Sequence, residues 1–127
     1  MKVGIAAESD CSDLATFLAV EVESKGHHVT EFRAAVDSKE NSRELAERVG
    51  RAVESGQVRT AILICRAGIS MAIGVNKVPG VRGAFCSSSD AVVRSRTEND
   101  ANGLCLSADQ SDPREISGLV GAWLSSW

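Results

Sequence analysis

Short apolar segments alternate with segments of helical periodicity from one end of the chain to the other. The apolar segments predict five strands, at residues 3–7, 28–32, 60–65, 81–86 and 103–106. Apolar residues that recur three or four positions apart predict helices between residues 12 and 26 and between 43 and 56, over 68–76 and 87–97, and from Pro113 to Trp127. Asp10 or Ser12 is expected to cap the first of these helices.

The segment at residues 60–65 is apolar on both faces, which is typical of a central strand in a parallel sheet. Strands that alternate with helices predict the α/β class, here a three-layer α/β/α sandwich around a five-stranded parallel sheet of Rossmann-like type. No linker, internal repeat or low-complexity segment interrupts the pattern. Residues 1–127 are therefore expected to form one domain.

The charge balance and the residue content limit which binding partners and which cellular compartment are expected. The 14 basic and 17 acidic residues give a net charge of -3, so neither nucleic acid nor an anionic membrane is an expected partner. The opening segment looks like a strand rather than a signal peptide, which favours the cytoplasm and free thiols for all four cysteines. The only histidines, His27 and His28, are adjacent and lack the spacing of metal ligands, so no metal or other cofactor is expected.

Ligands of open α/β sheets bind beyond the carboxyl ends of the strands. The loop after the third strand is the most informative here, because Cys65 stands directly before a small-residue loop and the start of a helix. Main-chain N–H groups at such a position favour negative charge, including that of a thiolate. Arg66 in the same loop suits a phosphate or carboxylate. The alternatives are that Cys65 is a small core residue and Arg66 an ordinary surface arginine.

Two longer runs of residues carry a resemblance to a known family. The first is residues 61–82, AILICRAGISMAIGVNKVPGVR, and the second is residues 99–102, Asn-Asp-Ala-Asn, followed by Leu-Cys-Leu at 104–106. The opening Met-Lys-Val and the Gly-His-x-Val at 26–29 agree as well. Across essentially its whole length the chain resembles the ribose-5-phosphate isomerase B and galactose-6-phosphate isomerase family.

The resemblance implies a sugar-phosphate aldose–ketose isomerase that works without metal. By the family's pattern, Cys65 would be the base that moves a proton between C1 and C2 of the sugar, and Asn99 would contact the enediolate intermediate. The main chain of the loop after the cysteine would hold the enediolate oxygen; that loop comprises Arg66, Ala67, Gly68, Ile69 and Ser70. Sites in the family form between two subunits, which predicts a homodimer or tetramer with its sites at the subunit interface.

At several positions that contact substrate in the family, this chain has a different residue. After the first strand it has Ala7-Glu8-Ser9 in place of Ser-Asp-His, so Glu8 and Ser9 become the candidate contacts to substrate. Ala67 replaces a threonine and Glu98 replaces a histidine, both associated with opening of the sugar ring; Glu98 remains a catalytic candidate beside Cys65 and Asn99. Asp109 stands where the family has an arginine.

The loss of phosphate ligands predicts a substrate other than a pentose phosphate: a shorter or open-chain sugar derivative, or one with a carboxylate that Arg66 would bind. We therefore expect an aldose–ketose isomerase that acts on a small sugar phosphate or related sugar derivative. The alternative is a non-catalytic or degenerate subunit that binds a ligand or completes a partner's site. A receiver or flavodoxin-like module ranks last, because receivers need an aspartate where Cys65 stands.

Overall fold

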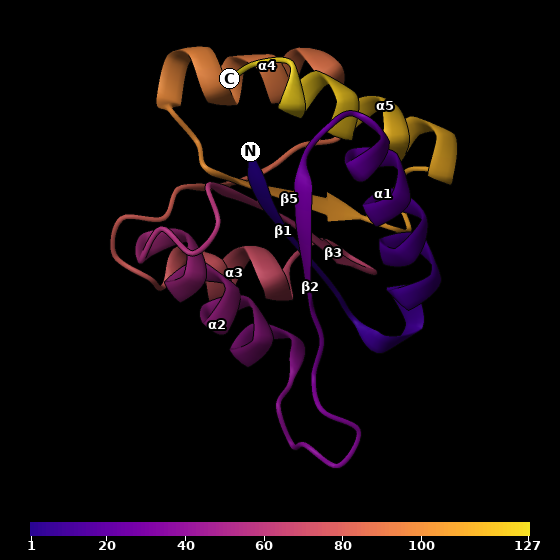
Figure 1. The fold of residues 1–127 in the computed structure, drawn as a ribbon, viewed down its shortest axis with the longest axis vertical. Helices are drawn as coiled ribbons and strands as arrows, with labels where there is room; N and C mark the ends of the chain where they lie inside the picture. The colour runs from indigo at the N-terminus through magenta and orange to yellow at the C-terminus, as the bar shows by residue number, and fades with distance from the viewer.

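Every segment of the predicted pattern forms the expected element in the computed structural model, which describes residues 1–127 (Figure 1). The strands are β1 (Lys2–Ala7), β2 (His28–Phe32), β3 (Thr60–Cys65), β4 (Gly83–Phe85) and β5 (Gly103–Ser107). The helices are α1 (Ser12–Ser24), α2 (Ser42–Glu54), α3 (Ser70–Asn76), α4 (Ser89–Asn99) and α5 (Pro113–Leu124), with a single 3₁₀ turn, η1 (Ser9–Cys11), before α1.

The five strands form one parallel sheet in the order β2-β1-β3-β5-β4, which confirms the predicted fold class. β3 is the central strand and is buried at all six positions. Its neighbours β1 and β5 run beside it in register, so that Ala7 pairs with Ile64 and Ser107 pairs with Cys65. The loops after these three strands therefore meet at the middle of one sheet edge.

Helices cover both faces of the sheet, with α1, α4 and α5 on one side and α2 and α3 on the other (Figure 1). Side chains alternate along β3, so Ile62 and Ile64 pack in the core under the first group, while Leu63 and Cys65 pack in the core under the second. This alternation determines which way Cys65 points.

Two helices begin with the reciprocal hydrogen bonds of a capping box. Asn41 accepts from the N–H of Glu44 at the start of α2, and Asp112 accepts from that of Glu115 at the start of α5. The expected cap of α1 by Asp10 or Ser12 is wrong: the 3₁₀ turn η1 leads into the helix, and no side chain caps it. None of the helices combines the length and apolar character needed to cross a membrane.

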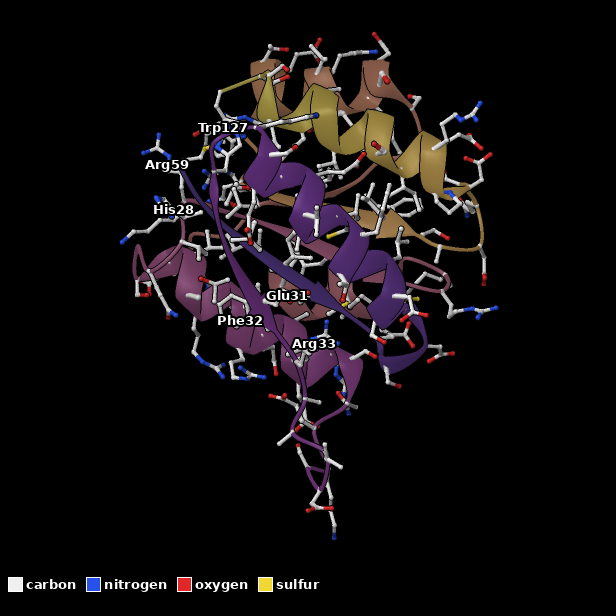
Figure 2. All side chains as sticks on the ribbon, turned by 45° about the vertical axis from the view of Figure 1, so that its right-hand side comes forward. His28, Glu31, Phe32, Arg33, Arg59 and Trp127 are labelled. Atoms are coloured by element: carbon white, nitrogen blue, oxygen red, sulfur yellow. The ribbon has the colours of Figure 1, made fainter.

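The last helix ends at Leu124, three residues earlier than its apolar pattern suggests. Trp127 lies beyond it, edge-on to the buried Trp123 with ring centroids 5.8 Å apart. The guanidinium of Arg96 stacks 3.5 Å from the Trp127 ring centroid, and that of Arg59 lies 5.4 Å from it. Arg59 and Trp127 lie side by side at one end of the molecule (Figure 2). Aromatic and cation–π contacts thus hold the C-terminal residue against the domain.

Candidate active site

Hydrogen bonds tie the loop after β3 to its neighbours on both sides. The N–H of Arg66 donates to Oε1 of Glu8 over 3.0 Å, which links the loop to the end of β1. On the other side, the N–H of Ala108 donates to the carbonyl of Cys65 over 2.9 Å, and Oγ of Ser107 donates to the carbonyl of Arg66 over 2.7 Å. Cys65 therefore sits at the centre of the sheet's carboxyl edge, where ligands of this class of fold bind.

Gly68 gives the loop its shape. Its φ of 81° lies in the left-handed region, which an L side chain adopts only under strain. A Cβ at this position would lie 2.3 Å from the ring of Phe85, so the main chain of the loop packs directly against that ring. The N–H groups of Ala67, Gly68 and Ile69 have no hydrogen-bond partner within the chain.

The thiol of Cys65 points away from the largest cleft. Cys65 is 2% exposed and packs in the core on the α2 and α3 face, near Met71, and it lines none of the five hollows of the surface. In a single chain, the side chain of Cys65 is therefore closed to solvent.

A cleft of about 490 Å³ opens on the opposite face, between α1 and α5. Leu14 and Phe17 form part of its apolar wall, and Arg66 reaches into it from the loop after β3. Nε of Arg66 lies 3.0 Å from Oδ1 of Asp109, and its Nη1 lies 3.9 Å from Oδ2 of Asp10. Both carboxylates already neutralise this arginine, so the geometry does not favour the predicted role of Arg66 in binding an anion.

The remaining candidates are dispersed. Ser9 lines a second hollow near the end of β2, and Ser70 lines a third between the starts of α2 and α3. Glu98 and Asn99 line a hollow along α4, where Oε1 of Glu98 accepts from Nε of Arg94 over 3.1 Å. The structure thus joins Glu8 to the loop of Cys65 but does not bring Ser9, Ser70, Glu98 and Asn99 to one place.

The position of Asn99 follows from the direction of α4. The helix starts after the carboxyl end of β4 and runs back over the sheet, so its last turn lies near the amino ends of the strands. Eleven helical residues span about 16 Å. Within one chain, Glu98 and Asn99 therefore lie at the opposite end of the sheet from Cys65.

The other three cysteines are free and buried. Burial raises the pKa of the Cys105 thiol to about 12 and also raises the pKa of Cys86. Burial, with the nearby charges of Glu8 and Asp10, raises the pKa of Cys11, which lines the cleft between α1 and α5. No group of three histidine, cysteine or carboxylate side chains is arranged to hold a metal ion.

The sequence pattern missed two aromatic residues of the site. Phe17 is one of the apolar residues of the helix predicted between residues 12 and 26, yet it is 46% exposed and lines the cleft. The pattern gave no sign of Phe85, which packs on Gly68 from a separate strand. The small residue at position 68 was the only available signal, because a glycine in a loop can mark a close approach of another group.

Comparison with known proteins gives the wider context of this geometry. Residues 3–127 match the family model described as Ribose/Galactose Isomerase. The D-erythrulose-4-phosphate isomerase of Pectobacterium atrosepticum is 30% identical over 128 residues, which cover 99% of this chain and 84% of that protein. The ribose-5-P isomerase B of Listeria innocua is 31% identical over 126 residues, with coverage of 99% and 85%.

A solved structure agrees along the same length. The ribose-5-phosphate isomerase B of Clostridium thermocellum has a TM-score of 0.90 and 31% identity, and the match covers 99% of this chain and 85% of that one. Fold and site together define a doubly wound α/β protein whose functional loops meet at the carboxyl edge of a parallel sheet. The chain belongs to the ribose/galactose isomerase family, a family of sugar-phosphate aldose–ketose isomerases.

Proposed function

We propose that this protein is an aldose–ketose isomerase that acts on a small sugar or sugar phosphate by proton transfer through an enediolate. The observation that carries the proposal is the place of Cys65, at the end of the central strand and directly before three unoccupied main-chain N–H donors. Family membership supports the substrate class, since the names of two relatives specify a four-carbon and a five-carbon sugar phosphate.

The chemistry needs two elements that this loop offers. A base must remove a proton from the carbon beside the carbonyl, and donors must stabilise the negative charge that develops on oxygen. In the proposal, the Cys65 thiolate takes the proton from one carbon and returns it to the neighbouring carbon. The N–H groups of Ala67, Gly68 and Ile69 hold the enediolate oxygen, whereas that of Arg66 is engaged by Glu8 and takes no part.

A second copy of the chain completes the site in this proposal. Because Asn99 lies at the far end of its own sheet, it would reach only the Cys65 of another protomer. Large apolar side chains are exposed on the loop, α3, β4 and α4, and they provide surface for such a contact. They are Ile69 at 61%, Ile73 at 51%, Phe85 at 43% and Val93 at 40% exposure. Exposed apolar groups of this kind mark interaction surfaces.

Exchange of carbon-bound hydrogen with deuterated water tests the base. The wild type is expected to exchange hydrogen beside the carbonyl of small ketoses or their phosphates, and Cys65→Ala is expected to slow this exchange by at least about 100-fold. Cys86→Ala is the matched control, because it removes another buried thiol, directly after β4 and two strands away from β3. Exchange that is equally fast in Cys65→Ala and in the wild type would exclude Cys65 as the base.

Subunit mixing tests the shared site. Cys65→Ala and Asn99→Ala are each expected to be nearly inactive as pure proteins. Refolding them together places an intact Cys65 opposite an intact Asn99 in some of the mixed assemblies, so part of the activity returns. A mixture as inactive as its components would refute a site built from two protomers.

The burial of Cys65 favours a second candidate function, a non-catalytic subunit that binds a sugar or completes a partner's site. The same exchange assay separates the two. A wild type that shows no exchange with any sugar, yet gains thermal stability from one of them, would support the second candidate.

A further inference from the structure

The cleft between α1 and α5 is acidic. Its charged lining side chains are Asp10, Asp13, Asp109 and Arg66, so the lining carries a formal charge of -2 at neutral pH. The cleft begins one residue beyond Cys65, and the N–H of Ala108 in its lining donates to the carbonyl of Cys65. A substrate whose reacting carbons lie over the loop after β3 would extend its other end into this cleft.

The single cation of the cleft is already paired. Arg66 lies between Asp109, at 3.0 Å, and Asp10, at 3.9 Å, and each of the three side chains is more than half exposed. A phosphate that binds the remaining N–H donors of Arg66 would lie beside both of these carboxylates. Like charges at such distances oppose binding.

Several main-chain donors around the cleft are also in use. The N–H of Arg66 donates to Glu8, and that of Asp109 donates to the carbonyl of Arg66 over 3.0 Å. The first turn of α5 opens with Pro113, which has no N–H, and Asp112 caps the turn. Phosphate sites in proteins rely on several free N–H groups and unpaired arginines. This end of the site offers no unpaired arginine, and Ser111 is the residue of its lining loop whose N–H has no partner.

We propose that this cleft receives an uncharged, hydroxyl-bearing end of the substrate and selects against a phosphate there. Carboxylates accept hydrogen bonds from hydroxyl groups, and Leu14 and Phe17 provide apolar surface for the carbon chain. Asp10 and Asp109 are then the residues that determine specificity. The inference rests on the proposed function and makes the preferred substrate an unphosphorylated short-chain sugar.

Matched pairs of ketoses test the selectivity. The pairs are D-erythrulose with its 4-phosphate and D-ribulose with its 5-phosphate, each assayed by hydrogen exchange with the wild type. We expect kcat/KM to be at least about 10-fold higher for the unphosphorylated member, because a cleft with a net negative charge slows the encounter with an anionic ligand by this order. The double variant Asp10→Asn/Asp109→Asn is expected to lose that preference, since it frees Arg66 and removes two negative charges.

Asp37→Asn is the matched control, because Asp37 lies in the loop after β2 and lines none of the cleft. It is expected to keep the wild-type preference. A wild type that prefers the phosphorylated member would overturn the inference while leaving the proposed isomerase intact.

Binding gives a readout that does not require turnover. The midpoint of thermal unfolding is measured with each member of a pair, for the wild type and for the double variant. The wild type is expected to be stabilised more by the unphosphorylated sugar, and the double variant to gain affinity for the phosphate. If the phosphorylated sugar stabilises the wild type and the double variant equally, the inference is overturned. This outcome can be read even if no hydrogen exchange is found and the proposed isomerase function is therefore wrong.

Discussion

Replacement of Gly74 by alanine tests the close packing of α3 against α2. Gly74 is buried in the middle of α3, and a Cβ there would lie 2.3 Å from the main-chain oxygen of Arg43 and 2.9 Å from Cβ of Ala46. Both atoms belong to the beginning of α2, and neither can rotate out of the way. The two helices would have to move apart to admit one methyl group.

Two opposing free energies decide the outcome. Alanine favours a helix over glycine by about 1 kcal/mol. Overpacking of a core costs about 1–3 kcal/mol, and we expect the upper part of this range because the clash is with main-chain atoms. The free energy of unfolding should therefore fall by about 1–2 kcal/mol, a decrease in Tm of about 3–8 °C for a chain of this size. Activity should fall as well, because α3 directly follows the loop after Cys65.

Urea unfolding followed by circular dichroism, at one fixed protein concentration, measures the change. Gly118→Ala is the matched control: Gly118 lies on the exposed side of α5, and a Cβ there meets nothing within 4 Å. This variant should be more stable than the wild type by about 0.5–1 kcal/mol. If Gly74→Ala also stabilises the protein, the helices are not packed as described and the reasoning fails.

Three further predictions concern buried or paired groups. Thr60→Val should cost about 1–3 kcal/mol, because Oγ1 of Thr60 accepts the buried indole N–H of Trp123 over 3.0 Å and valine leaves that donor without a partner. Glu40→Gln should cost about 0.5–1 kcal/mol at neutral pH, because it removes the negative charge and one of the two oxygens that accept hydrogen bonds from Arg48. Those bonds lower the pKa of Glu40, so the difference from wild type should hold above the ordinary value of 4.5 and vanish as the pH falls through the lowered pKa. Cys105, whose pKa burial raises to about 12, should resist alkylation by iodoacetamide near neutral pH until urea unfolds the chain.

Controls for these predictions come from the same chain. Thr97→Val changes an exposed threonine and should alter the unfolding free energy by less than about 0.5 kcal/mol. Glu23→Gln removes an exposed carboxylate that forms no ion pair and should alter the unfolding free energy at neutral pH by less than about 0.5 kcal/mol. A Thr60→Val variant as stable as Thr97→Val would show that the indole N–H finds another partner. Mass spectrometry that finds Cys105 alkylated in the folded protein would contradict its burial.

The pattern of apolar residues predicted the fold well because neighbouring residues carry most of that information. The strand over Thr60–Cys65 was predicted to the residue, since an apolar run with no polar face fits only the interior of a sheet. The end of α5 was predicted three residues too late, because Trp127 continues the apolar periodicity after the helix has ended. Its position there depends on stacking with Arg96 and Arg59, which are distant in the sequence.

The candidate site was predictable only in part. Local sequence placed Cys65 and its loop at the carboxyl edge of the sheet, and the structure agrees. Local sequence also suggested that Arg66 binds an anionic group of the substrate. In the structure, Asp109 and Asp10, which come from other segments of the chain, pair with it instead. A charged side chain's partners come from whichever loops the topology brings together, and residue types along one segment do not reveal them.

Taken alone, the order of apolar and polar residues determined the α/β class, the number of strands and the loop that carries Cys65. These properties depend on periodicity and on contacts within a segment. Only the tertiary structure decided that the Cys65 thiol faces α2 and α3, that the open cleft lies on the other side, and that Asn99 is remote from both. Strand order and the direction of each helix set those relations, and both arise from contacts between residues far apart along the chain.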